Sequence, residues 1–393
     1  MKYNMKGTWR LVKTVATPFQ KFIQSEQSAG IVLVITTIVS LVLANSSWQN
    51  AYISFWENNL AISIADLHLS FSFTGWINDA LMALFFLLVG IELKKEFIQG
   101  ELAEKKNAVL PFLLALGGMV MPALLYTLFN LHTPTANGWG VPMATDIAFA
   151  LTIFRLLGNK VSYSLKILLT ALAVIDDLGA IVVIALFYTS QLSIYYLLIS
   201  ILWTIIGIVL SYYKIRFTSL YLLLGILLWY TLHAAGIHPT IAGVAIGFLL
   251  PINQGNKVGD ALHYTVPYFI LPLFIAANTA LSLDLSLDFV TLPNIGIFVG
   301  LVIGKPVGII LAAWCAKITK IATLPSTVNM HDIVGLGLTA GIGFTVSIFV
   351  ASLSYIQIPI LNGAKLSIML ASLLASMLGY AYLSFLYTKN NPK

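Results

Sequence analysis

The feature that most constrains the fold of this chain is a succession of long apolar blocks separated by short polar connections. There are twelve blocks, mostly of 17–27 residues, and about 20 apolar residues in a helix cross a hydrocarbon core roughly 30 Å thick. Each block can satisfy its own backbone hydrogen bonds as a helix, which lipid requires, whereas a membrane barrel would show shorter alternating segments. The blocks are 29–45, 75–98, 108–130, 138–157, 163–189, 192–212, 217–233, 237–252, 262–283, 293–316, 331–354 and 362–387.

The composition also places the chain in a membrane. Hydrophobic residues make up 59% of it and charged residues only 9%, whereas soluble domains carry about 25% charged residues. We therefore predict an all-α polytopic membrane protein with one twelve-helix domain over residues 29–387. Residues 1–28 form an N-terminal segment, in which 9–23 could be a short surface helix interrupted near Pro18, and residues 388–393 form a tail. The single cysteine, Cys315, excludes an intramolecular disulfide.

Lysine and arginine predict the orientation, because cytoplasmic loops are enriched in them. The chain has 21 such residues, and 19 of them, all except Lys305 and Lys365, fall at the two ends or in alternate connections. The other connections are acidic or neutral. Both termini are therefore predicted to be cytoplasmic. A basic inner face suits anionic membrane lipid, and nothing in the pattern favours nucleic acid.

One connection has the pattern of a β-hairpin. Residues 60–73 alternate between apolar and small or polar side chains, which is the period of a strand. A lone hairpin is marginally stable in water, so pairing with a second subunit would stabilise it. An ordered loop of a monomer is the alternative.

Two adjacent aspartates, Asp176 and Asp177, interrupt the fifth block. A carboxylate at the centre of a membrane helix costs about 2.5–3.5 kcal/mol on insertion scales, and two like charges also repel each other. We interpret the pair as a site that handles a cation or a proton; a structural pair among helix ends is the alternative. Because neighbouring side chains on a helix diverge by about 100°, the two acids are expected to have different partners.

Lys305 lies deep in the tenth block and has to be paired or neutral there. We read it as the only deep base of the chain, so an aspartate of the fifth block is its expected partner. The pair could be a purely structural salt bridge, or a bridge that opens on protonation during a transport cycle.

Two blocks contain signals of a broken helix. In the fourth block, Gly140 and Pro142 precede Thr145 and Asp146, whose oxygens suit a small hard cation; a helix N-cap is the alternative. The eleventh block has four glycines between residues 335 and 343, which favour either close helix packing or an unwound stretch. Interrupted helices in matching positions of two halves point to a transporter site.

The other ionisable candidates lie nearer the ends of the blocks, where an ordinary interfacial role is the alternative for each. They are Asp79 and Glu92 in the second block, His238 near the outer surface, and Asp260 and His263 on the inner side. A histidine titrates near neutral pH and can sense it.

The chain resembles the NhaA family of bacterial Na+/H+ antiporters. The similarity runs from the first block to the last, in the order and spacing that the family has. The matching segments are Trp76–Met82, Phe85–Glu92, Ala144–Ala150, Ile175–Ala180, Ile303–Pro306 and Gly341–Thr345.

The resemblance implies inverted repeats, with helices four and eleven broken and crossed at mid-membrane; this family is one of those on which the description of that architecture rests. It implies electrogenic, pH-regulated export of Na+ or Li+ in exchange for protons across the bacterial inner (plasma) membrane, without a cofactor, and a homodimer formed through the outer hairpin. The protein would thus be a secondary transporter serving sodium and pH homeostasis, and not an enzyme.

The resemblance also implies roles for single residues. Asp177 would be central to ion and proton binding and Asp176 would pair with Lys305. Thr145 and Asp146 would lie at the broken helix beside the site. Asp79 and Glu92 would be accessory, the latter near a cytoplasmic funnel involved in the pH response. The family has a glutamate in the connection between helices eight and nine, where this chain has Gly259, with Asp260 and His263 nearby.

Two other classes of protein were considered. A Na+-coupled symporter of related fold would need a cavity for an organic substrate. An intramembrane aspartyl protease also uses two membrane aspartates, but on different helices and with a Gly-x-Gly-Asp motif. Here the two acids are adjacent and that motif is absent from the sequence.

Overall fold

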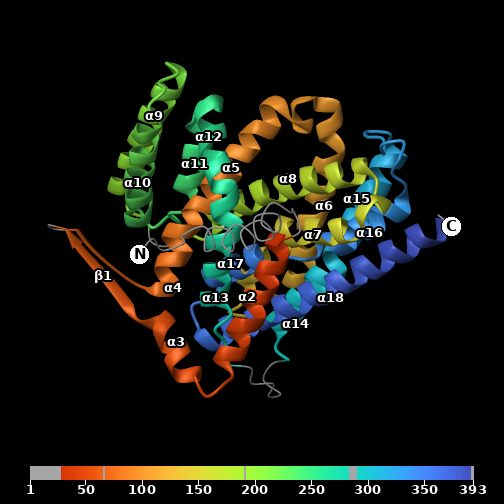
Figure 1. Cartoon of the computed structure of the whole chain (residues 1–393), viewed down its shortest axis with the longest axis horizontal. Helices are drawn as coiled ribbons and strands as arrows, with labels where there is room; N and C mark the ends of the chain where they lie inside the picture. Colours follow the sequence, from red (N-terminus) through yellow and green to blue (C-terminus); the bar gives the residue numbers. More distant parts are fainter. Residues whose placement is uncertain (1–27, 65–66, 190–191, 283–289, 391–393) are drawn as a thin grey trace, which may run out of the picture.

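The protein is a bundle of helices from which one β-hairpin projects (Figure 1). The computed structural model describes residues 28–64, 67–189, 192–282 and 290–390. The predicted surface helix over 9–23 and the last three residues of the predicted tail lie outside the described residues. The start of that tail continues the last helix, which ends at Asn390.

The elements follow the apolar blocks closely. The first half contains α2 (Ser28–Ala44), α3 (Gln49–Glu57), β1 (Asn59–Ile64), β2 (Leu67–Ser72), α4 (Phe73–Trp76), η1 (Ile77–Leu81), α5 (Met82–Gln99), η2 (Glu101–Ala103), α6 (Lys105–Asn130), η3 (Ala136–Met143), α7 (Ile147–Leu156), η4 (Gly158–Lys160) and α8 (Tyr163–Phe187). The second half contains α9 (Ile194–Tyr212), α10 (Thr218–Ala234), α11 (Ile241–Leu249), α12 (Ile252–Thr265), η5 (Val266–Ile270), α13 (Leu271–Asn278), α14 (Leu292–Val299), η7 (Gly300–Gly304), α15 (Lys305–Thr319), α16 (Met330–Ala340), α17 (Phe344–Ser354) and α18 (Ile358–Asn390).

The helices have the length and apolarity of membrane spans. In the described part of the chain, seven continuous helices are long and apolar enough to cross a membrane, and the number rises to nine if each of two bent pairs is one span. The predicted number of twelve crossings stays a prediction. The outward face of α9 is apolar and exposed, as expected of a surface that faces lipid.

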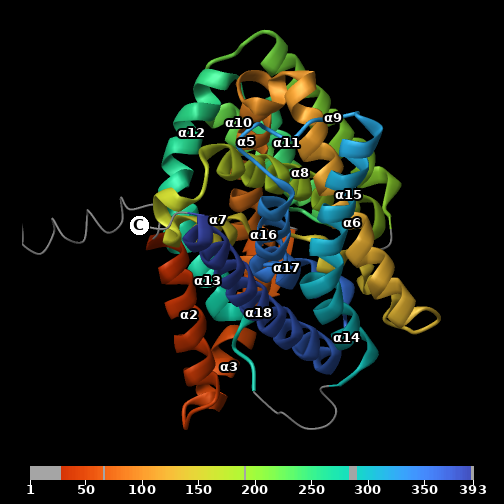
Figure 2. The same cartoon turned by 90° about the vertical axis from the view of Figure 1, so that its right-hand side faces the viewer.

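The helices pack in two groups. In one group, α5 lies against α11 and α12, and α10 lies between α9 and α11. In the other, α6 lies against α8, α14 and α15, and α16 lies against α15 and α18. Figure 1 shows the first group to the left of the second, and Figure 2 views the molecule from the side of the second group. Helix α5 of the first group contacts α8 of the second, so the helix that carries Asp176 and Asp177 lies at their boundary.

The predicted hairpin is confirmed. Strands β1 and β2 pair antiparallel, from Asn59 opposite Ser72 to Ile64 opposite Leu67. The indole of Trp76 donates to the carbonyl of Leu60 at 2.9 Å, which ties the base of the hairpin to the start of the following helix. The hairpin and α3 lie at the opposite end of the bundle from the connection between α5 and α6 (Figure 1).

Two sequence interpretations were wrong. Lys305 is not the only deep base, because Lys365 lies two turns inside α18 and is only 6% exposed. Helix α18 packs against α14, α16 and α17, so a residue two turns inside it can be buried. Asp260, which falls in the predicted connection between the eighth and ninth blocks, lies on α12, as does His263 at the start of the ninth block; α12 continues through η5 into the apolar helix α13.

Candidate ion-binding site

Two broken helices meet at the centre of the protein. Residues 144–146 separate η3 from α7. Residues 341–343 separate α16 from α17, and these two helices are bent by 49° relative to each other. Pro142 cannot donate a backbone hydrogen bond, and the glycines tolerate the irregular backbone of the second break. The amide of Asp146 donates to the carbonyl of Ile342 at 2.6 Å, so the two breaks are joined directly.

Asp146 caps two helices at once. Its Oδ1 accepts from the amide of Phe149 at 3.2 Å, in the first turn of α7. Its Oδ2 accepts from the amide of Thr345 at 3.1 Å and from the hydroxyl of the same residue at 2.5 Å, in the first turn of α17. Helix N-termini carry unsatisfied N–H groups and a partial positive charge. One carboxylate therefore compensates two positive helix ends, and the N-cap interpretation holds for this residue.

Lys305 provides the opposite charge on the other side of the crossing. Its ammonium group lies 2.9 Å from Oδ2 of Asp176, and both side chains are fully buried. It also donates to the carbonyl of Met143, the last residue of η3, where a helix end is negative. A π-helical turn, η7, and then Pro306 flank this lysine; such turns are frequent at functional sites.

The two adjacent acids have different surroundings, as expected from their positions on one helix. The hydroxyl of Thr145 lies 2.7 Å from Oδ2 of Asp176 and 3.1 Å from the carbonyl of Ala340. In the described residues, Oδ1 of Asp176 has no hydrogen-bond partner. Asp177 is 5% exposed and forms no hydrogen bond or ion pair with the described part of the chain. The site therefore has carboxylate oxygens that remain open to a cation or proton.

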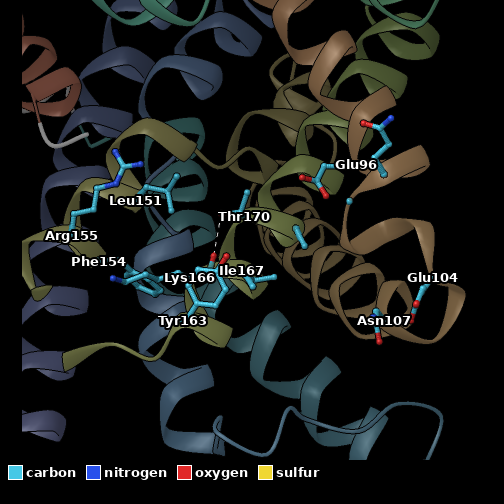
Figure 3. Close-up of a pocket in the computed structure, with 13 residues that line it drawn as sticks. Glu96, Glu104, Asn107, Leu151, Phe154, Arg155, Tyr163, Lys166, Ile167 and Thr170 are labelled. Atoms are coloured by element: carbon cyan, nitrogen blue, oxygen red, sulfur yellow. Dashed lines mark hydrogen bonds between the residues drawn. The ribbon is translucent and has the colours of Figure 1, made fainter. Parts of the chain in front are cut away.

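A cavity of about 710 Å³ lies at the Tyr163 end of α8, the helix that carries the acids (Figure 3). Its walls come from the end of α5, the start of α6, and from α7 and α8. Thr170 and Ala171 line it and precede Asp176 on α8 by about one and a half helical turns. Glu96 and Glu104 contribute acidic groups to one wall, and Arg155 and Lys166 contribute basic groups to the other. A hydrated cation could thus come close to the paired acids.

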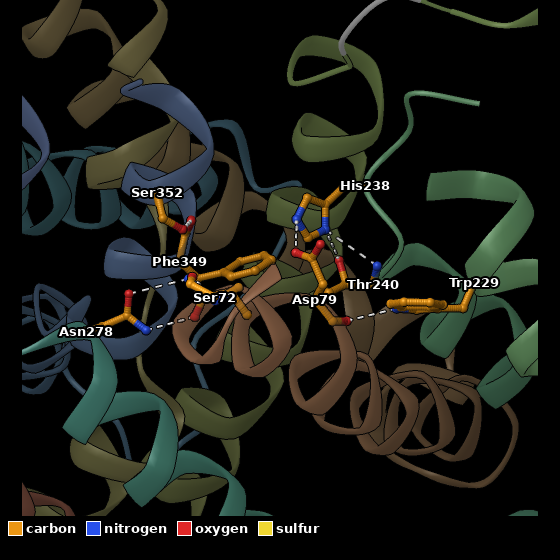
Figure 4. A network of polar contacts seen from close by, with 10 residues as sticks. Ser72, Asp79, Trp229, His238, Thr240, Asn278, Phe349 and Ser352 are labelled. Carbon is orange, nitrogen blue, oxygen red and sulfur yellow. Dashed lines mark hydrogen bonds and ion pairs between the residues drawn. The ribbon is translucent and has the colours of Figure 1, made fainter. Parts of the chain in front are cut away.

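A second polar cluster lies toward the outer end of α5 (Figure 4). Nε2 of His238 lies 3.5 Å from Oδ1 of Asp79, and Nδ1 lies 2.7 Å from the hydroxyl of Thr240. The indole of Trp229 donates to the backbone carbonyl of Asp79 at 3.0 Å. The ring of Phe349 packs edge-on against His238 and also contacts Phe86. Apolar rings thus border the cluster on the side of α17.

A comparison with known proteins decides the family. The model of the family described as Na+/H+ antiporter 1 matches residues 20–383. The chain belongs to the NhaA family of Na+/H+ antiporters. It is 45% identical over 384 residues to the Na+/H+ antiporter NhaA of Flavobacterium psychrophilum, covering 93% of this chain and 96% of the relative. It is 44% identical over 376 residues to that of Citrobacter koseri (92% and 97%) and 42% identical over 392 residues to NhaA 2 of Clostridium beijerinckii (96% and 97%). These relatives carry the names of transporters and not of enzymes.

The structure brings only some of the predicted NhaA-family site residues together. Thr145, Asp176 and Lys305 are in contact, Asp146 lies one residue along from Thr145, and Asp177 is next to Asp176. Asp79 and His238 form a separate outer pair. Glu92 is partly buried near the inner end of α5, whereas Asp260 and His263 are exposed on α12 and do not contact the acids.

Sequence reasoning missed two partners in this NhaA-family site. Thr345 binds Asp146 through both its amide and its hydroxyl, and the carbonyl of Met143 accepts from Lys305. The contact of Thr345 with Asp146 could have been suspected, because Thr345 closely follows the glycine-rich break and Thr is common at the start of a helix. A backbone carbonyl leaves no signal in the side-chain sequence.

Proposed function

We propose that this protein is an electrogenic antiporter that exports cytoplasmic Na+, or Li+, in exchange for protons, with a rate that depends on pH. Membership of the Na+/H+ antiporter family supports the exchange. The observation that carries the assignment of the site is the buried carboxylate pair, Asp176 and Asp177, on the helix that also lines the cavity. Hard oxygen ligands suit Na+ and Li+, and the same carboxylates accept protons.

Asp177 is proposed as the shared seat of the ion and the proton. Its lack of a partner among the described residues supports this, because a group already engaged in a salt bridge would have to release its partner before it bound an ion. Asp176 is proposed to add its Oδ1 and Thr145 a neutral oxygen. Asp146 already accepts three hydrogen bonds, so we propose that it acts on the ion mainly through its negative charge.

Competition for one site couples the two flows. At high cytoplasmic pH the acids lose their protons and Na+ binds. A rigid-body movement of one helix group against the other then turns the site outward, where protons displace the ion. The position of α8 at the boundary of two helix groups supports such a movement. Two carboxyl groups in one site could carry more than one proton for each Na+, which would make the exchange electrogenic.

We also propose a membrane topology, a location, an oligomeric state and a set of accessory residues. Inverted repeats and twelve crossings would place both termini in the cytoplasm at the bacterial inner membrane, as the distribution of basic residues supports. The hairpin β1–β2 would join two subunits in a homodimer. Asp79, Glu92, His238, Asp260 and His263 would be accessory to transport or to its pH response.

Proteoliposomes with an acidic lumen and a pH-sensitive dye test the proposed function. Addition of Na+ or Li+ should release luminal protons and restore fluorescence, whereas K+ should not. Collapsing the membrane potential with valinomycin and K+ should change the rate if the exchange is electrogenic. Folded protein that shows no Na+-dependent proton flux at any pH between 6 and about 9, the range in which histidine and buried carboxylates titrate, would refute it.

A further inference from the structure

Helices α5 and α11 touch through their backbones. A Cβ added at Gly90 would lie 2.7 Å from the carbonyl oxygen of Val244, and one added at Gly247 would lie 2.8 Å from the Cα of Gly90. Small residues allow such close approach of membrane helices. Because no side chain separates them there, a movement of α5 at this level has to carry α11 with it.

Helix α11 ends abruptly just beyond this contact. Its last residue is Leu249, Leu250 is extended with ψ 129°, and α12 begins at Ile252. Pro251 has no N–H to donate, and the last carbonyls of any helix lack an intrahelical partner. The break therefore leaves acceptors that need a donor from elsewhere.

Lys94 of α5 supplies that donor. Its ammonium group donates to the carbonyl of Phe248 at 2.8 Å and to the carbonyl of Leu250 at 2.6 Å. Both bonds are charge-assisted, and a cation at a helix C-terminus is also favoured by the helix dipole. Helix α11 itself contains no charged residue. The neighbouring Lys95 is exposed and forms no such contact.

We call the two hydrogen bonds from Lys94 to the end of α11 the latch. The latch lies between the cavity and the contact of α12 with α5. Two to six residues further along α5, Glu96, Gln99 and Gly100 line the cavity. Beyond the break between α11 and α12, helix α12 packs against α5. A Cβ at Gly255 would lie 3.7 Å from Cγ2 of Ile91. One ammonium group therefore joins the α5 wall of the cavity to the junction of α11 and α12.

We propose that Lys94 is a positioning residue for ion entry: its two hydrogen bonds to the end of α11 hold the inner end of α5 in the place where it forms one wall of the cavity. Lys94 does not touch the acids, so it acts on the population of the entry-competent arrangement and not on the exchange step itself. This inference rests on the proposed exchange of Na+.

Without the latch, the inner end of α5 can leave the arrangement that opens the cavity. The apparent affinity falls with the populated fraction of the competent state. In Lys94→Met, which keeps the length and loses the donors, we expect the apparent KM for Na+ to rise about tenfold or more, the scale of one lost charge-assisted hydrogen bond. The maximal rate at saturating Na+ should stay within about twofold, because binding can still draw the protein into the competent state.

Three variants make the experiment specific. Lys94→Arg keeps two or more donors and should restore the KM to within about twofold of the unchanged protein. Lys95→Met removes the same charge from the adjacent, exposed position and should leave the KM unchanged. In a Cys315→Ser background, Ile91→Cys with Gly255→Cys should form a disulfide between α5 and α12. Oxidation should then return the KM of the Lys94→Met variant toward its original value, and reduction should raise it again.

Each outcome has a clear meaning when Na+-driven dequenching is measured in proteoliposomes. If unchanged protein shows no Na+-dependent flux, the proposed function fails. If unchanged protein exchanges Na+ and Lys94→Met has the same KM, the inference fails. It also fails if the maximal rate falls while the KM stays constant, or if Lys95→Met raises the KM equally. Should Lys94→Met not fold, Lys94→Gln takes its place, because its amide is neutral and one atom shorter than the lysine side chain and cannot reach both carbonyls. An unchanged KM in Lys94→Gln, measured without the disulfide, contradicts the inference.

Discussion

The ammonium group of Lys305 lies 2.9 Å from Oδ2 of Asp176, and neither side chain is exposed. Removing one partner of a buried ion pair leaves an uncompensated charge, which costs about 3–5 kcal/mol. We therefore expect Lys305→Met to lower the thermal stability of the protein in detergent markedly. Adding Asp176→Asn should recover much of the loss.

Lys365 offers a matched control for this prediction. It is also a buried lysine, but in the described residues it has no acidic partner. Lys365→Met should keep or raise the melting temperature. A Lys305→Met variant as stable as the unchanged protein, or a double variant no better than the single one, would contradict the interpretation of this ion pair.

Asp146 holds the first turns of α7 and α17 together. Losing a cap costs about 0.5–2 kcal/mol, so Asp146→Ala should destabilise the protein by about twice the loss of a single cap. Thr345→Val, which removes only the hydroxyl that binds Asp146, should cost less. Thermal unfolding in detergent measures both. Equal losses for the two variants would show that the carboxylate does not join the helices as described.

His238 and Asp79 link the segment before α11 to η1, the turn that leads into α5. An ion pair between two segments that move apart during transport restrains that movement. If this pair restrains outward exposure, His238→Gln should exchange Na+ at a lower pH than the unchanged protein does, so that the half-maximal point of its pH profile shifts down.

His331→Gln is the control for that shift, because His331 is exposed in the first turn of α16 and is not among the residues proposed for the pH response. Its pH profile should match that of the unchanged protein. A shift of the His238→Gln profile toward higher pH, or equal shifts in the two variants, would refute the role of the outer pair.

The two ends of the hairpin are close enough for a short linker to join them. The amide of Phe73 donates to the carbonyl of Asn58 at 3.0 Å, so the two ends of the hairpin are adjacent. Replacing residues 59–72 by a short glycine linker should give a protein that still exchanges Na+ but is monomeric in detergent. Light scattering coupled to chromatography distinguishes the two masses. A shortened protein that remains a dimer would place the interface elsewhere.

Much of the fold follows from the sequence because lipid leaves few choices. Every apolar block contains helix, interrupted at 144–146 in the fourth and at 341–343 in the eleventh, and the strand period of residues 60–73 marks the hairpin. The breaks before Asp146 and before Phe344 are also where the proline and glycine residues place them. Which helices pack against each other cannot be predicted from the sequence of one block, because it depends on contacts between blocks such as those of Gly90 and Gly247.

The site was predictable to the extent that charge is rare in a membrane. The scarcity of bases led from Lys305 to an aspartate of the fifth block, and the family resemblance selected Asp176. The same reasoning failed for Lys365, which is buried although it lies near the start of α18. The contacts to Met143, Phe248 and Leu250 could not be predicted, because they use backbone carbonyls. The sequence pattern indicates where a helix breaks but not which side chain caps the broken end.

The most direct test of the central claim is Na+-driven proton release from proteoliposomes that contain Asp177→Asn. The amide keeps the shape of the side chain but can neither bind Na+ as a carboxylate nor exchange a proton. We predict that exchange falls to the level of empty liposomes, whereas Asp260→Asn, at an exposed position on α12, retains it. Unimpaired exchange by folded Asp177→Asn protein would contradict the claim that Na+ and protons share this carboxylate.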